Sequence, residues 1–171
     1  KRAMTDIEYG LRHLVEQGLS DPDRICAVGW SYGGYAALLS AIEFPERYRC
    51  VVSIAGVSDP VLLVRDDWGL SQKYMKSLIS RKTEDVEGGS PRRRASEIQV
   101  PVLLFHGDRD VNVPIKHSEL METALRRAKK QVELVEYKDV DHGIPRQKLR
   151  IDMLRRIGIF LGENLTPRDS N

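Results

Sequence analysis

The sequence predicts an α/β fold with a mostly parallel sheet that is covered by helices on both faces. Apolar runs with the length of buried strands recur along the 171 residues, at 25–28, 50–55 and 100–106. Segments with the apolar spacing of helices lie between these runs. Strands that are continuously apolar and alternate with helices are typical of a parallel sheet that is buried on both faces.

The first third of the chain is expected to form a helix, a strand and a second helix. Thr5 and Glu8 have the spacing of a capping box, which predicts that the first helix begins there. Apolar residues then recur at helical spacing until Gly18, a residue that often ends a helix. The strand at 24–29 follows, and the helix after it should stop at Pro45, because proline cannot continue a helix.

The remainder of the chain continues this alternation. After the strand at 50–55 we expect a helix with breaks over 60–83, and after the strand at 100–106 a helix that begins at Pro114. The segment 132–137 alternates apolar and polar residues, as an outer strand does. A last amphipathic helix is expected to present one apolar face, made of Ile151, Leu154, Ile157, Ile159, Phe160 and Leu161.

The composition is that of a globular domain. Hydrophobic residues make up 41% and charged residues 30%, and the net charge is only +2. This charge is too small to predict a nucleic-acid or anionic-membrane partner. No apolar run approaches the roughly 18 residues that a membrane-spanning helix needs. Since no signal peptide is visible either, we expect a cytoplasmic protein.

The two cysteines, Cys26 and Cys50, both lie in apolar strand-like runs. We expect them to be buried free thiols rather than a disulfide, because free cysteine behaves as a small hydrophobic residue. No set of cysteine and histidine residues has the spacing of a metal site. We therefore expect neither a metal nor an organic cofactor.

The segment 29–34, with the sequence GWSYGG, is the most informative part of the chain. A G-x-S-x-G motif between a buried strand and a helix is typical of a nucleophile elbow. Such a turn should hold Ser31 in a strained backbone conformation and expose its hydroxyl at the tip of the sheet. A Cβ at Gly29 or Gly33 should collide with the neighbouring strand or helix. The backbone amide of Tyr32, at the start of the helix, should face a developing oxyanion.

Three predicted strands are followed by a serine, an aspartate and a histidine. Ser31 follows the first strand, the segment 106–110 (HGDRD) the third and the segment 140–143 (VDHG) the fourth. The carboxyl ends of parallel strands lie at one edge of a sheet, so these loops should meet there. The order Ser, Asp, His is that of the α/β-hydrolase triad, which predicts a partial α/β-hydrolase fold.

His142 is the candidate general base. Of the four histidines, it alone lies in a short loop between a strand and a helix, from which its ring can reach Ser31. His13 lies within the first predicted helix, and His117 lies in the first turn of a later one. The main alternative is His106, which ends a strand and is expected to pack or to bond a loop.

Four aspartates are candidates for the acid that orients the base and stabilises its imidazolium form. Asp139 and Asp141 are too close to His142 along the backbone for an easy fit, and Asp108 could cap its own turn. Asp110 can point back toward the His142 loop. Spacing alone favours Asp110 only slightly.

Three motifs together resemble the catalytic domain of the prolyl oligopeptidase family of serine peptidases, nearest to its dipeptidyl-peptidase and acylaminoacyl-peptidase branches. They are GWSYGGY at 29–35, HGxxDxxVP at 106–114 and DHG at 141–143, and the resemblance runs from about residue 6 to residue 161. The resemblance implies that Asp110 is the triad acid and that Tyr32 contributes its amide to the oxyanion hole. It also places three apolar residues, equally well explained as core, around the substrate pocket: Val57, Leu63 and Val113.

The resemblance implies a serine peptidase that hydrolyses short peptides through an acyl-enzyme on Ser31. The alternatives are an esterase of the same fold and a catalytically incomplete fragment with a structural role. The family pattern includes earlier strands, a β-propeller and a tyrosine oxyanion donor, so we expect residues 1–171 to be the carboxyl-terminal part of the domain. The strand at 24–29 would then be an edge strand, through which we expect self-association as a homodimer.

Overall fold

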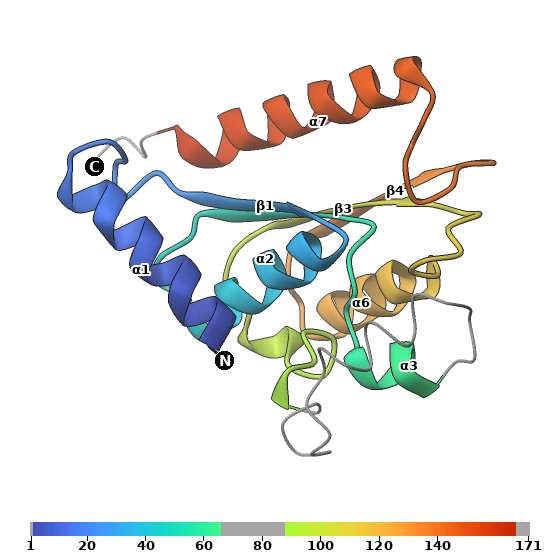
Figure 1. The fold of residues 1–171 in the computed structure, drawn as a ribbon, viewed down its shortest axis with the longest axis horizontal. Coiled ribbons are helices and arrows are strands. Elements are labelled where there is room, and N and C mark those ends of the chain that lie inside the picture. Colours follow the sequence, from blue (N-terminus) through green and yellow to red (C-terminus); the bar gives the residue numbers. More distant parts are fainter. Residues whose placement is uncertain (1, 66–87, 167–171) are drawn as a thin grey trace.

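The computed structural model describes residues 2–65 and 88–166. Within them lies one sheet with the strand order β1-β2-β3-β4, and all three neighbouring pairs are parallel (Figure 1). The strands are β1 (Cys26–Trp30), β2 (Cys50–Ile54), β3 (Val102–Gly107) and β4 (Val132–Tyr137). The predicted parallel sheet is therefore confirmed, and β1 is an edge strand of the sheet in the described residues.

Helices cover both faces of the sheet, as the apolar strands require. The helix α7 lies on one side, and α1, α2 and α6 lie on the other (Figure 1). The helices and the short 3₁₀ helix η1 have these bounds: α1 Arg2–Glu16, α2 Tyr32–Glu43, α3 Pro60–Arg65, η1 Ala95–Glu97, α6 Lys116–Arg127 and α7 Gln147–Leu165. The rest of the helix that we expected over 60–83 lies outside the described residues.

Neighbouring residues of one strand point to opposite faces and so build two separate cores. Val51 and Leu104 pack with Leu38 of α2 on one face. Val52 and Phe105 pack with Ile157 of α7 on the other. Among the described residues, no helix is both long and apolar enough to cross a membrane.

The first helix differs from its prediction. The helix α1 begins at Arg2, so Thr5 lies inside it and does not cap its start. Glu8 is buried and forms an ion pair with Arg47 at 2.6 Å, which explains its presence better than a capping box does. The predicted end is confirmed, because Gly18 has a φ of 68° and its amide donates to the Val15 carbonyl at 2.9 Å.

The last helix buries less of its apolar surface than we expected. Ile157 is buried, but Ile151, Leu154 and Ile159 are 57–63% exposed, and Met153 is buried in their place. Six apolar positions within eleven residues extend around more of the helix than its contact with the sheet can cover. The apolar spacing therefore predicted the helix correctly and part of its buried face wrongly.

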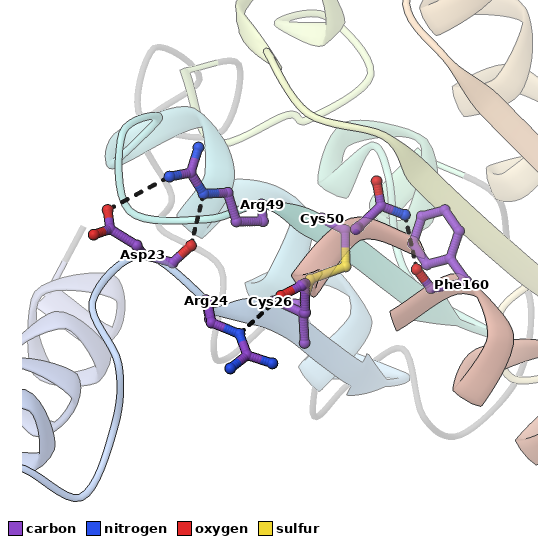
Figure 2. Close-up of a disulfide and its surroundings, with 8 residues drawn as sticks. Asp23, Arg24, Cys26, Arg49, Cys50 and Phe160 are labelled. Atoms are coloured by element: carbon purple, nitrogen blue, oxygen red, sulfur yellow. Dashed lines mark hydrogen bonds and ion pairs between the residues drawn. A yellow bond between two sulfur atoms is a disulfide. The ribbon is translucent and has the colours of Figure 1, made fainter. Parts of the chain in front are cut away.

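The two cysteines form a disulfide, so the prediction of free thiols is wrong. Cys26 and Cys50 are register partners on the neighbouring parallel strands β1 and β2, with Cα atoms 4.7 Å apart. Figure 2 shows the bond between the starts of these strands, with the Asp23–Arg49 ion pair and Phe160 nearby. The pairing depends on strand register, which the apolar runs alone do not define.

Candidate active site

Ser31 lies between the end of β1 and the first residue of α2. Its φ of 56° and ψ of −117° are unusual for a residue that carries a side chain, which confirms the predicted strain. Two backbone hydrogen bonds hold this conformation: the Ser31 amide donates to the Ile54 carbonyl at 2.8 Å, and the Ser31 carbonyl accepts from the Tyr35 amide at 3.2 Å. The turn is therefore fastened to both β2 and α2.

The glycines around Ser31 have different tasks. A Cβ on Gly29 would overlap the carbonyl of Gly33 and lie 2.7 Å from the amide nitrogen of Gly34, so the prediction for Gly29 is confirmed. A Cβ on Gly33 would have nothing within 4 Å, so the predicted collision there is wrong. The close approach occurs one residue later, because a Cβ on Gly34 would lie 2.6 Å from Ser53 Oγ of β2.

Asp110 and His142 are in direct contact. The Nδ1–H of His142 donates to Oδ2 of Asp110 at 2.6 Å. The other carboxylate oxygen, Oδ1, accepts from the backbone amides of Asn112 at 2.9 Å and Val113 at 2.8 Å. Both oxygens therefore have donors, and the carboxylate is held in one orientation.

The three competing aspartates have other partners and are exposed. Asp108 accepts from the Val140 amide at 3.3 Å, which lies in the loop before His142 and not in the turn that Asp108 was expected to cap. Asp139 pairs with Arg109 at 2.5 Å, and Asp141 accepts from the Gly143 amide at 3.0 Å. The choice that spacing left open is thus resolved in favour of Asp110 as the partner of His142.

The environment of Asp110 favours its ionised form. Burial by itself would raise the pKa of this carboxyl group, but the hydrogen bonds from His106, His142 and the Val113 amide lower it well below the usual 3.8. Asp110 therefore carries a negative charge at neutral pH, where it can stabilise an imidazolium on His142.

The loop that carries His142 lies against the end of β1. The indole Nε1–H of Trp30 donates to the backbone carbonyl of His142 at 3.2 Å, and Trp30 directly precedes Ser31. At the end of β3, which is separated from β1 by β2, a Cβ on Gly107 would overlap the carbonyl of Val140, so glycine permits the close approach of the Asp110 and His142 loops. The three loops expected to carry the triad thus meet at one edge of the sheet.

The remaining histidines have other surroundings. His13 is exposed on α1. His117 is buried, and its Nδ1 accepts from the amides of Ser58 at 3.2 Å and Asp59 at 3.4 Å. Burial lowers the pKa of His117 to about 4, so its ring is neutral at neutral pH. The sequence did not reveal this network, because its members come from separate loops.

The residues expected to contact substrate lie in several places. Tyr32 is the first residue of α2, where helix amides have no acceptor within the helix, and its side chain is exposed. Val57 and Val113 are buried, whereas Leu63 of α3 is half-buried. Their burial agrees with a place in the core, and their part in a substrate pocket stays a prediction.

Comparison with known proteins identifies the family. Residues 1–168 match the prolyl oligopeptidase family. An uncharacterized peptidase of Bacillus subtilis, YtmA, is 36% identical over 132 residues, which cover 75% of this chain and 51% of the relative. The chain therefore spans about half of the length of this relative.

Solved structures have the same fold. A puromycin-hydrolyzing peptidase of Mycobacterium tuberculosis superposes with a TM-score of 0.88 at 25% identity, over 96% of this chain and 25% of that one. An acylaminoacyl peptidase of Pyrococcus horikoshii superposes with a TM-score of 0.85 over 98% of this chain and 29% of that one. Because the two sequences are only 21% identical, this likeness shows the fold alone. The α/β-hydrolase fold and the resemblance inferred from the three motifs are confirmed, and this chain belongs to the prolyl oligopeptidase family.

Proposed function

We propose that this chain carries the catalytic residues of a serine peptidase that cleaves short peptides through an acyl-enzyme on Ser31. The observation that carries the proposal is the 2.6 Å hydrogen bond between His142 and Asp110, beside the strained turn of Ser31. A serine, a histidine and an ionised aspartate at one sheet edge are the groups that nucleophilic acyl transfer needs.

In this mechanism the Ser31 hydroxyl oxygen attacks the carbonyl carbon of the scissile bond. His142 accepts the hydroxyl proton on Nε2, while Asp110 holds Nδ1–H and stabilises the imidazolium. The amide of Tyr32 stabilises the oxyanion of the tetrahedral intermediate. His142 then gives the proton to the leaving amine, and a water molecule repeats the sequence to release the acyl group from Ser31.

The alternative base, His106, fits this role less well. Its side chain is 0% exposed, and both of its ring nitrogens lie near buried protein atoms. A general base must reach the hydroxyl whose proton it accepts. His142, half-buried and attached to the edge beside Trp30, is the better candidate.

Labelling with a fluorophosphonate probe tests the nucleophile. The full-length gene product should be labelled, and Ser31→Ala should abolish the labelling and the turnover of peptide p-nitroanilides. Ser96→Ala is a matched control, because Ser96 is exposed in η1 and should not affect either measurement. Unchanged labelling of Ser31→Ala would refute the assignment.

The substrate class is tested separately, because a fold does not decide function. We compare rate enhancements, that is, kcat/KM divided by the rate constant of the uncatalysed hydrolysis. For the same acyl group, we expect a larger rate enhancement with the peptide p-nitroanilide than with the p-nitrophenyl ester. The relatives named above are described as peptidases, which supports this expectation. A preference for the esters would favour an esterase instead.

A further inference from the structure

His106 lies at the end of β3, behind the carboxylate of Asp110. Its Nε2 is 2.8 Å from the carbonyl oxygen of Val113 and 3.3 Å from Oδ2 of Asp110. Its Nδ1 is 2.7 Å from the hydroxyl of Ser118 in α6. The side chains of His106 and Asp110 are both 0% exposed, so water cannot replace these contacts.

The partners of His106 determine which nitrogen carries its proton. The Val113 carbonyl and the ionised Asp110 carboxylate only accept hydrogen bonds, so Nε2 must be protonated. The Ser118 hydroxyl can donate to Nδ1, which allows the ring to be neutral. Oδ2 of Asp110 therefore faces two N–H groups, one from His142 and one from His106.

We propose that His106 is a positioning residue whose Nε2–H shares Oδ2 of Asp110 with His142, and thereby offsets part of the negative charge of this carboxylate. The proposal rests on the proposed function of Ser31, Asp110 and His142. The same N–H joins the carboxylate to the Val113 carbonyl, and the Val113 amide donates to Oδ1. His106 thus fixes both Asp110 and the turn that follows it.

The effect on His142 has a defined direction. A donor on Oδ2 weakens the attraction between the carboxylate and an imidazolium on His142. Without this donor, Asp110 stabilises the imidazolium more strongly, and the pKa of His142 rises. Because catalysis requires neutral His142, the acid limb of the kcat/KM profile should move to higher pH.

The other titratable groups near this cluster do not provide the same contact. His117 lies on α6 behind His106, and its lowered pKa of about 4 keeps it neutral at the pH of the experiment. Asp59, whose amide donates to Nδ1 of His117, is paired with Arg92 and Arg93. Asp108 and Asp141 flank the site but are exposed, so solvent screens them.

The test is a pH titration of the full-length gene product, followed by the NMR signals of the His142 ring and by kcat/KM. His106→Phe keeps a ring but removes the donor, and it should raise the pKa of His142 and the acid limb by about half a pH unit or more. His106→Gln retains a donor near the Nε2 position and should stay close to the wild type. Ser118→Ala is the matched control, because it removes only the partner of Nδ1 and should not shift either midpoint.

An equal shift in His106→Phe and Ser118→Ala, or no shift in a folded His106→Phe protein, would overturn the proposal. If His106→Phe does not fold, the ¹⁵N spectrum of the wild type decides, since the proposal requires a proton on Nε2 of His106. Failure of the fluorophosphonate to label Ser31 would contradict the proposed function, while the titration of His142 would still decide the role of His106.

Discussion

The glycines of the nucleophile turn provide a sharp test of the geometry, because two of them differ by only four positions in sequence. Gly29→Ala places a methyl group against the backbone of Gly33 and Gly34, 2.7 Å from the Gly34 nitrogen, where ordinary contact begins at 3.4 Å. Gly33→Ala places the same group where no atom lies within 4 Å. The pair therefore compares one overlap with one open position.

The expected loss of stability for Gly29→Ala follows from what must move. The obstructing atoms are backbone atoms, and the turn is held by the Ser31–Ile54 and Ser31–Tyr35 hydrogen bonds. Overpacking costs about 1–3 kcal/mol, and the loss of one such hydrogen bond costs about 1 kcal/mol more, so we expect a loss of about 3 kcal/mol. Gly33→Ala should be neutral or should stabilise the protein by up to about 1 kcal/mol, because alanine favours the helix.

Urea unfolding of both variants, followed by circular dichroism, measures the difference in the free energy of unfolding. The wild type and Gly33→Ala should have similar midpoints, and Gly29→Ala should unfold at a clearly lower urea concentration. Equal midpoints for the two variants would refute the claim that position 29 is sterically closed and position 33 is open.

Four further predictions concern Asp110, the disulfide and the edge strand. Asp110→Asn should lower kcat about 10⁴-fold, as expected when the base loses its orienting carboxylate, and a loss below tenfold would contradict the triad. Because folding lowers the pKa of Asp110, its ionised carboxylate stabilises the protein above the unfolded-state pKa near 3.8, and this stabilisation is lost as the pH falls through the folded value. In Asp110→Asn the free energy of unfolding should therefore fall less steeply as the pH is lowered. Reduction of the Cys26–Cys50 disulfide, which closes a loop with a sequence separation of 24, should lower the free energy of unfolding by about 3.5 kcal/mol, whereas a double serine variant should not respond to the reductant. The edge strand β1, on which Val28 is 48% exposed, should support homodimers in this 171-residue chain, and a clean monomer in sedimentation at tens of micromolar would count against this interface.

The sequence predicted the arrangement of the candidate site better than it predicted the packing. Ser31 was recognisable because a buried strand and a helix flank it, and His142 because it follows another strand in a short loop. The choice of Asp110 required the family resemblance, since Asp108 lies in the same segment only two residues away and spacing favours Asp110 only slightly. Its contact with His142 then appeared in the structure.

What remained hidden depends on register and on side-chain direction. The disulfide requires Cys26 and Cys50 to be opposite each other on β1 and β2, and apolar runs do not define that register. The indole of Trp30 reaches the carbonyl of His142 across 112 residues of sequence, so no local pattern could indicate it. The partners of His106 likewise come from a turn and from α6.

The covalent link between β1 and β2 bears on where the protein can work. The loop that it closes contains Ser31 and all of α2. Cytosolic thiol systems keep such bonds reduced, whereas the periplasm and the extracellular space preserve them. The cytoplasmic location expected from the sequence and this bond are therefore in conflict, and the thiol state of Cys26 in intact cells would reveal which environment the protein experiences.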